Sequence, residues 1–313
     1  MKIVFWGTPD FALPALEVLS AGPHRVAAAV TRPDRFGGRG ERLLLPPVKT
    51  LAQKMGLPVL QPEKLTLPEW REKLEKLGAE LMVVVAYGRF IPAAVADIFP
   101  SGAINLHPSL LPRWRGAAPI QWALIEGDRE TGATVIRLSP RLDAGDILGR
   151  VTAPIRERDD HLALSSRLAR LGADLLLRVV GEIEKGTVTA VPQDENLVAW
   201  APAFEKSSGL IDWSLPADRI DRLIRGLNPW PGTYTYYPAP SGPARLKILA
   251  GRPRLEGEGG IGEILLAQDD RLVIKAGAGA LEIDRLQPSG GRVLTAGEFL
   301  RGHGLRAGDI LGG

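Results

Sequence analysis

Leu81-Met82-Val83-Val84-Val85-Ala86 is an unbroken apolar run, and it decides the fold class. Strands that are buried on both faces show this pattern, and they occur in parallel sheets covered by helices. Similar short apolar stretches alternate with helical patterns around it. This βαβ alternation predicts an α/β fold with an open, mostly parallel, Rossmann-like sheet. The other expected strands are Ile3–Trp6, Arg25–Val30, Pro58–Leu60, Ala103–Leu106 and Thr134–Leu138, and the expected helices are Ala12–Leu19, Leu45–Met55, Glu69–Leu77 and Ala163–Ile183.

The pattern changes near Val188, where polar and proline-containing sequence indicates a linker that runs over the surface. Short strands separated by glycine and proline follow, between two helices expected at Ala217–Gly226 and Thr295–Arg301. This arrangement predicts a small OB-like β-barrel domain. The predicted organisation is a Rossmann-like catalytic domain over residues 1–189, a linker over 190–206 and a barrel over 207–313. The expected barrel strands are Thr233–Tyr237, Arg245–Ala250, Gly260–Ala267, Arg271–Ala276 and Ala280–Leu286.

Composition excludes several classes of site. The 313 residues include no cysteine, so disulfides, thiolate zinc sites and a cysteine nucleophile are excluded. The histidines are too scattered for a local metal motif, and we expect no metal. No apolar run is long enough for a membrane span, and the first residues are broken too early for a signal peptide. We therefore expect a cytoplasmic protein, and a monomer. The histidines are His24, His107, His161 and His303.

The stretch from Gly102 to Gly116 is the first candidate for chemistry. Asn105 and His107 lie two residues apart at the end of an expected strand, so their side chains should point to the same side. Ligands of open α/β sheets bind outside the carboxyl ends of the strands. This placement favours a functional pair. An isolated Asn-x-His is also typical of a capping asparagine and a structural histidine.

The second candidate is Asp143 in the stretch Leu142–Asp146, which follows the expected strand Thr134–Leu138. At the carboxyl edge of the sheet its carboxylate could orient and stabilise an imidazole, although an Asp-Gly turn is an equally ordinary interpretation. Asn, His and Asp together suit acyl transfer to an amine. Amide and imidazole N–H groups stabilise the tetrahedral oxyanion, and the amine attacks without a serine or cysteine nucleophile.

The motifs Asn105-x-His107, Ser109–Gly116 and Leu142–Asp146 resemble the 10-formyltetrahydrofolate-dependent formyltransferase family. The resemblance implies that 10-formyltetrahydrofolate is the formyl donor and that Asn105, His107 and Asp143 form the catalytic trio. Two positions depart from the family pattern, since Ala144 stands where Thr is commoner and Pro108 where Gly is often found. The residues that the resemblance places along the folate site are Ser109, Leu110, Leu111, Pro112, Ala86, Tyr87 and Gly88.

Further segments resemble the branch of this family that formylates methionyl-tRNA. They are Gly7–Phe11, Pro33–Gly40, Ile211–Ser214, Arg225–Pro231 and Leu286–Pro288, so the resemblance covers nearly the whole chain. The implied reaction transfers the formyl group to the α-amino group of methionyl-initiator-tRNA and gives N-formylmethionyl-tRNA for translation initiation. The branch also implies tRNA binding by the C-terminal barrel.

In that branch the loop after the second strand enters the acceptor-stem region, and the matching arginine here is Arg39, with Arg35 and Arg42 beside it. Residues 31–49 hold five basic and two acidic residues, which suits contacts with phosphates. The same composition is typical of a solvated surface loop.

Three other functions compete with this interpretation. A folate-dependent amino-sugar nucleotide formyltransferase would share the trio, but the basic loop argues against it. A nicotinamide-dependent dehydrogenase would need the spaced glycines that are missing after Gly7. A non-enzymatic nucleic-acid-binding module would leave the trio unexplained. The residues from Ser207 onward hold 13 basic and 12 acidic residues, which does not by itself indicate nucleic acid, and we expect Trp213 and Trp230 in the core.

Overall fold

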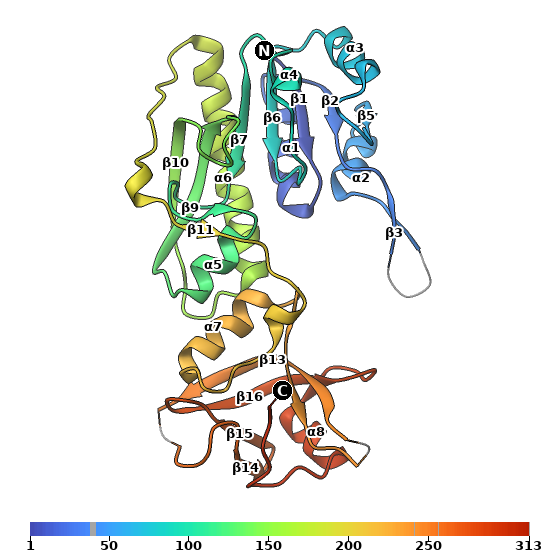
Figure 1. The fold of residues 1–313 in the computed structure, drawn as a ribbon. Coiled ribbons are helices and arrows are strands. Elements are labelled where there is room, and N and C mark those ends of the chain that lie inside the picture. The colour runs from blue at the N-terminus through green and yellow to red at the C-terminus, as the bar shows by residue number, and fades with distance from the viewer. Residues whose placement is uncertain (38–41, 241, 256, 313) are drawn as a thin grey trace. The chain divides into compact units, whose positions relative to one another are not determined.

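The computed structural model describes residues 1–37, 42–240, 242–255 and 257–312, and the chain forms two compact units (Figure 1). The first comprises Met1–Pro119, Glu130–Pro154 and Leu164–Ala201, and the second Ile120–Arg129, Ile155–Ala163 and Pro202–Gly313. These units do not coincide with the predicted boundaries. Most of the predicted linker belongs to the first unit, and two early segments join the second. Arg39 lies outside the described residues.

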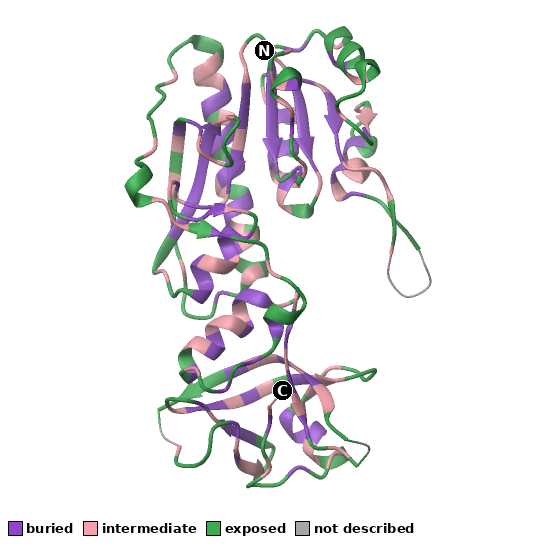
Figure 2. Cartoon of the chain, viewed as in Figure 1, coloured by how far each residue is buried: buried purple, intermediate pink, exposed green. Residues whose placement is uncertain are grey.

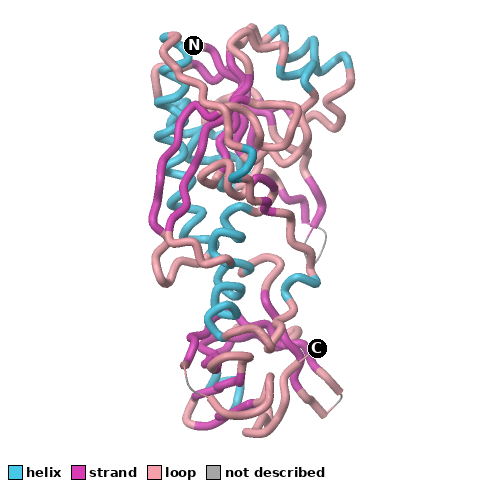
Figure 3. Tube along the Cα trace, turned by 60° about the vertical axis from the view of Figure 1, so that its left-hand side comes forward, coloured by secondary structure: helices cyan, strands magenta, loops and turns pink. Residues whose placement is uncertain are grey.

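The first unit is built on a seven-stranded sheet with the strand order β10-β9-β7-β6-β1-β2-β5. The five strands from β7 to β5 are parallel, as predicted, and helices lie beside them (Figure 3). The strands are β1 (Lys2–Gly7), β2 (Arg25–Val30), β5 (Val59–Leu60), β6 (Leu81–Val85), β7 (Ala103–His107), β9 (Glu130–Arg137) and β10 (Ile147–Pro154). The helices are α1 (Leu13–Ala21), α2 (Pro47–Lys54), α3 (Pro68–Lys76), α4 (Ala93–Ala96) and α6 (His161–Lys185), with a 3-10 turn, η1 (Asp10–Ala12), before α1.

Alternating residues of the central strands enter two separate cores. In β1, Ile3 and Phe5 pack with α1, α2 and α6, whereas Val4 and Trp6 pack with α3 and α4. Every residue of β6 is buried, which explains its unbroken apolar sequence (Figure 2). The Rossmann-like prediction for this half of the chain is confirmed.

The edge formed by β9 and β10 differs from the prediction. The sequence predicted only a short strand at Thr134–Leu138, but β9 already begins at Glu130. A second strand that was not predicted, β10, follows after a loop and pairs antiparallel with β9. β9 runs antiparallel to β7, with His107 opposite Thr134 and Ile104 opposite Arg137. The end of β9 therefore lies beside the beginning of β7. Asp143 follows β9, so the direction of this strand alone would leave it away from the carboxyl end of β7.

Two further small sheets were not predicted. The segment that we expected to be a loop after β2 forms a hairpin, in which β3 (Arg35–Gly37) pairs with β4 (Arg42–Leu44). Phe36 pairs with Leu43 across this hairpin, and Phe36 is 74% exposed. In the second sheet, β8 (Arg115–Gly116) runs parallel to β11 (Trp200–Ala201), which ties residues 200–201 to the loop after β7. A short helix, α5 (Pro119–Ile125), follows β8, and the 3-10 turn η2 (Glu195–Leu197) precedes β11.

The second unit is an antiparallel barrel with the strand order β12-β13-β16-β15-β14, and β17 pairs with β16. The last residues close it, because Gly312 bridges Tyr236 of β12 and Ile310 bridges Glu263 beside β14. Closure removes the free strand edges. The elements are η3 (Ser207–Gly209), α7 (Ala217–Leu227), β12 (Thr233–Tyr237), β13 (Ala244–Arg254), β14 (Ile264–Gln268), β15 (Arg271–Lys275), β16 (Ala280–Pro288), β17 (Leu294–Thr295) and α8 (Ala296–Gly302).

One apolar core fills this barrel and confirms the predicted fold class for the second half. Trp213 is buried, and its indole N–H donates to Thr235 Oγ1 at 3.0 Å, as its expected core position requires. The same expectation was wrong for Trp230, which is 55% exposed. Phe299 of α8 is fully buried, edge-on to Tyr237 and stacked on His303 with ring centroids 4.1 Å apart.

We predict that Phe299→Ala lowers the free energy of unfolding by about 3–5 kcal/mol, because the substitution leaves a cavity in the barrel core. Chemical denaturation followed by circular dichroism measures this change. Phe36→Ala is the control, and its effect should stay within about 0.5 kcal/mol because the side chain is on the surface. Equal effects of the two substitutions would show that Phe299 does not hold the barrel together.

Candidate functional site

The end of β7 presents Asn105 and His107 on one face of the sheet. Ile104 and Leu106 point into the core beneath α6, so the alternate residues face the opposite side, as predicted. Asn105 is partly exposed, and its amide has no hydrogen-bond partner among the described residues. His107 is only 4% exposed. The strand therefore offers one free amide next to one enclosed imidazole.

The two ring nitrogens of His107 face different groups. Nε2 lies 2.9 Å from the backbone oxygen of Trp114, and Nδ1 lies 3.6 Å from Asp143 Oδ2. A carbonyl oxygen can only accept, so Nε2 carries the proton in this hydrogen bond. Trp114 has a positive φ of 66°, which few residues other than glycine adopt. The turn after β7 thus places its carbonyl against the imidazole at the cost of an uncommon backbone conformation.

Asp143 reaches His107 because its loop folds back across the sheet. The Gly116 amide donates to Asp143 Oδ2 at 3.0 Å, and Asp143 itself has a φ of 49°. The loop also requires Gly145, since a Cβ atom there would lie 1.8 Å from the Arg137 carbonyl oxygen. The predicted proximity of Asp143 to His107 is therefore found, but a folded loop produces it and not the direction of β9.

Gln193 and Arg115 support this loop through hydrogen bonds, and the sequence analysis predicted neither residue. The Gln193 amide donates to the carbonyl oxygens of Asp143 and Gly145, both at 2.8 Å. Its oxygen accepts from Arg115 Nε and Nη2 at 3.0 and 2.8 Å. Arg115 is 2% exposed and also pairs with Glu195 at 3.0 Å. These bonds join residues 48 to 80 positions apart, which no local motif could have revealed.

The predicted folate residues after β7 fall into two groups. Ser109 and Leu111 are buried: the Ser109 hydroxyl donates to Arg113 O at 2.6 Å, and Leu111 packs with Ile136 and Ile147. Thr134 Oγ1 holds this turn by donating to Ser109 O and accepting from the Leu111 amide. Leu110 and Pro112 are partly exposed. Only the latter two side chains are accessible to a ligand in this conformation.

The predicted folate residues after β6 also differ in exposure. The Tyr87 side chain is buried edge-on to Trp6, and its carbonyl oxygen accepts from Thr8 Oγ1 and Arg32 Nε. Ala86 and Gly88 are exposed and both have positive φ values, 49° and 74°. A Cβ atom on Gly88 would meet the Arg32 guanidinium at 2.2 Å. The turn therefore exposes backbone, whereas the tyrosine ring is part of the core.

Two cations mark the base of the β3–β4 hairpin. Burial lowers the pKa of Arg32, and the like charges of Arg35 and Arg89 lower it further. Lys49 pairs with Asp34 at 2.5 Å, and Gln61 donates to the same carboxylate at 2.7 Å. Arg35 and Arg42 are exposed on the hairpin. The base of the hairpin is thus held by an ion pair and a hydrogen bond, whereas Arg35 and Arg42 on its strands are exposed to solvent.

The described residues contain no group of three or more His, Asp or Glu side chains arranged to hold a metal ion. Within the same residues, no helix has the length and apolar character needed to cross a membrane.

Comparison with known proteins covers nearly the whole chain. The profile described as "Formyl transferase" matches residues 1–180, and the "Formyl transferase, C-terminal domain" profile matches residues 204–304. The methionyl-tRNA formyltransferase of Citrifermentans bemidjiense is 43% identical over 312 residues, which cover 100% of this chain and 96% of the relative.

Solved structures share the fold at lower identity. HypX from Aquifex aeolicus, in complex with tetrahydrofolic acid, superimposes with a TM-score of 0.66 at 19% identity over 97% of this chain and 48% of its own. WlaRD, a sugar 3N-formyl transferase, gives a TM-score of 0.65 at 14% identity over 92% of this chain and 97% of its own. At such identities the likeness concerns the fold alone.

We predict that Gln193→Ala loosens the Asp143 loop. The substitution leaves two carbonyl groups without their donor and the buried Arg115 without one acceptor, and each unmade hydrogen bond costs about 1–3 kcal/mol. Hydrogen exchange followed by mass spectrometry should show faster exchange of residues 138–146 and of the Gly116 amide. Asn196→Ala, three residues away on the exposed turn, is the control. Unchanged exchange in the Gln193 variant would mean that other contacts hold the loop.

Proposed function

The chain belongs to the methionyl-tRNA formyltransferase family, and on this premise we propose that Asn105, His107 and Asp143 carry its reaction. The reaction transfers the formyl group of 10-formyltetrahydrofolate to the α-amino group of methionyl-initiator-tRNA. The observation that carries the assignment of residues is their convergence: a free amide, an enclosed imidazole and a carboxylate 3.6 Å from it meet on one side of β7.

The chemistry needs stabilisation of charge more than a protein nucleophile. The methionine amine attacks the formyl carbon, a C–N bond forms, and negative charge develops on the formyl oxygen. When the tetrahedral intermediate collapses, the bond from the formyl carbon to the folate nitrogen breaks, and that nitrogen gains a proton while the attacking amine loses one. Donors aimed at the oxyanion lower this barrier, and one such donor typically contributes about 10²–10³-fold.

Asn105 is the donor that is already available, because its amide has no partner among the described residues. His107 is the second donor. Its Nε2 proton is engaged by the Trp114 carbonyl, so the formyl oxygen must replace that carbonyl as the acceptor. Asp143 faces the other ring nitrogen and supports positive charge on the imidazole during the reaction. Asp143 is thus assigned a positioning and electrostatic role.

The folate co-substrate fits the turns that flank this trio. Ala86 and Gly88 expose their backbone at the end of β6, and Leu110 and Pro112 offer partly exposed apolar side chains after β7. Apolar walls with exposed backbone donors and acceptors suit a flat heterocycle. We assign Tyr87, Ser109 and Leu111 to the scaffold of the same walls, because their side chains are buried.

For the tRNA, we propose that Arg35 and Arg42 of the hairpin contact the acceptor stem, together with Arg39, which lies between them in the sequence. Arg35 and Arg42 have no carboxylate partner among the described residues, and two neighbouring β-strands hold them in place. Unneutralised arginines attract phosphates and also match base edges. The amino-sugar nucleotide alternative gives these cations no function.

We predict that Asp143→Asn lowers kcat for formylation by about 10²–10⁴-fold, as loss of a positioned acid–base or orienting group does. Asparagine retains an oxygen that accepts from the Gly116 amide, so the loop should stay folded. Steady-state kinetics with charged initiator tRNA measures the change, and circular dichroism checks the fold. Near-normal turnover in a folded variant would remove Asp143 from the mechanism.

We predict that Arg42→Ala weakens transfer to tRNA without changing folate affinity. One lost phosphate contact should reduce the slope of log(kcat/KM) against log(salt) by about one unit. Kinetics at several salt concentrations, beside direct folate titration, tests this. Arg178→Ala is the control, because Arg178 is already paired with Glu182 on α6. An identical salt slope in the two variants would show that the hairpin does not contact tRNA.

A further inference from the structure

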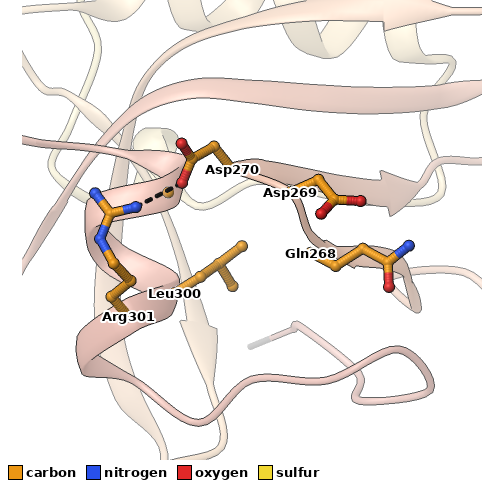
Figure 4. A pocket seen from close by; sticks show the side chains of 6 residues that line it. Gln268, Asp269, Asp270, Leu300 and Arg301 are labelled. Atoms are coloured by element: carbon orange, nitrogen blue, oxygen red, sulfur yellow. Dashed lines mark hydrogen bonds and ion pairs between the residues drawn. The ribbon is translucent and has the colours of Figure 1, made fainter.

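Arg115 carries a buried positive charge next to the candidate site. Its side chain is 2% exposed, and among the residues that the structure describes it is the only arginine or lysine that is buried. The Arg301–Asp270 pair beside α8 shows the usual arrangement: its atoms lie 2.6 Å apart, and the two side chains are 65% and 72% exposed (Figure 4). Removing a guanidinium from water is costly unless it is paired and hydrogen-bonded. Burial of Arg115 therefore depends on the partners of its guanidinium.

The Arg115 guanidinium is held by two acceptors on the segment before β11. Gln193 Oε1 accepts from Nε and Nη2 at 3.0 and 2.8 Å, and the Glu195 carboxylate accepts from Nη1 and Nη2 at 3.2 and 3.0 Å. Glu195 is half-exposed, and its hydrogen bonds with Arg115 are the main reason that its pKa is lowered. The planar fork of a guanidinium fits both acceptors at once, whereas a lysine ammonium is a single point charge.

These bonds close a ring around Asp143. One path runs from the Arg115 side chain to Gln193, which donates to the carbonyl oxygens of Asp143 and Gly145. The other path runs along the backbone from Arg115 to Gly116, whose amide donates to Asp143 Oδ2 at 3.0 Å. Asp143 is thus held at its carbonyl group and at its carboxylate, and Arg115 is connected to both of the groups that hold it.

The backbone has an uncommon conformation at two points of this ring. Trp114, directly before Arg115, has a φ of 66°, and Asp143 has a φ of 49°. Residues other than glycine persist in this region only where surrounding contacts fix them. The Arg115 amide also donates to the Ala199 carbonyl at 2.9 Å. Backbone and side chain of Arg115 therefore both tie the turn after β7 to the segment before β11.

We propose that Arg115 is a positioning residue of the formyl transfer, which acts by keeping the Asp143 carboxylate beside His107. The inference rests on the proposed function, because it concerns the role of Asp143 in that reaction. Arg115 has almost no exposed surface with which to touch either substrate. Its contribution is made through Asp143, because a misplacement of about 1 Å can cost on the order of 10²-fold in rate. An arginine that only stabilised the fold would not act through Asp143.

The first test is Arg115→Met, which retains an apolar side chain and removes the guanidinium. We expect kcat for formylation of charged initiator tRNA to fall about 10- to 100-fold, with KM for tRNA and for 10-formyltetrahydrofolate unchanged. Arg115→Lys should recover only part of the loss, because one ammonium group does not replace the fork. Arg301→Met is the matched control, since it breaks an arginine–carboxylate pair on the surface, and its kinetics should equal those of the wild type.

The decisive test combines Arg115→Met with Asp143→Asn. If Arg115 acts through Asp143, the double variant should be no slower than Asp143→Asn alone, because residues that act as a unit are not additive. Losses that multiply in the double variant would overturn the proposal, as would normal kcat in folded Arg115→Met enzyme.

Thermal unfolding identifies a variant that fails to fold. If Arg115→Met does so, Glu195→Ala carries the same comparison, because it removes one acceptor of the guanidinium from a half-exposed position. Its kcat should also fall, and the loss should again disappear in the Asp143→Asn background. Failure of the wild type to formylate tRNA would instead overturn the proposed function.

Discussion

The approach of Asp143 to His107 is the contact on which the candidate site depends. The two residues come from segments that their strands alone would separate, because β9 runs antiparallel to β7. The loop after β9 brings the carboxylate back by a positive φ at Asp143, a close approach that only Gly145 allows, and two hydrogen bonds from Gln193. Residues remote from the reacting groups thus determine whether the imidazole has a carboxylate beside it.

Much of the fold could be predicted because it follows from local patterns. The unbroken apolar run of β6 predicted a doubly covered parallel strand, and the two-residue spacing of Asn105 and His107 predicted their shared face. The rest depends on pairings between distant segments. Neither the direction of β9, nor the partnership of Arg115 with Gln193, nor closure of the barrel by Ile310 and Gly312 leaves a periodic signal in the sequence.

The residues that the motifs assigned to the folate site differ in how far their side chains are buried. Among the folate residues, Ser109 and Leu111 are buried in the turn that supports the site, whereas Leu110 and Pro112 reach its surface. A motif therefore records both the residues that a ligand could touch and those that hold the backbone in shape. Burial separates the two groups, and sequence alone cannot.

The basic residues also differ from one another, because some are paired with carboxylates and others are not. The barrel sequence is nearly neutral, yet Asp284 and Glu282 pair with Arg252, Arg254 and Arg271, whereas no carboxylate among the described residues pairs with Arg245 or Lys247. In the β3–β4 hairpin, likewise, Arg35 and Arg42 are exposed, whereas Lys49 and Asp34 beside the hairpin form an ion pair. Net charge gave no indication of either feature, because both depend on which side chains are neighbours in space.

The most direct measurement is a side-by-side assay of two acceptors. The wild-type chain would be given labelled 10-formyltetrahydrofolate with methionyl-initiator-tRNA in one reaction and an amino-sugar nucleotide in the other. We expect rapid labelling of the tRNA-bound methionine and little labelling of the sugar. Labelling of the sugar amine with no transfer to the tRNA would contradict the account.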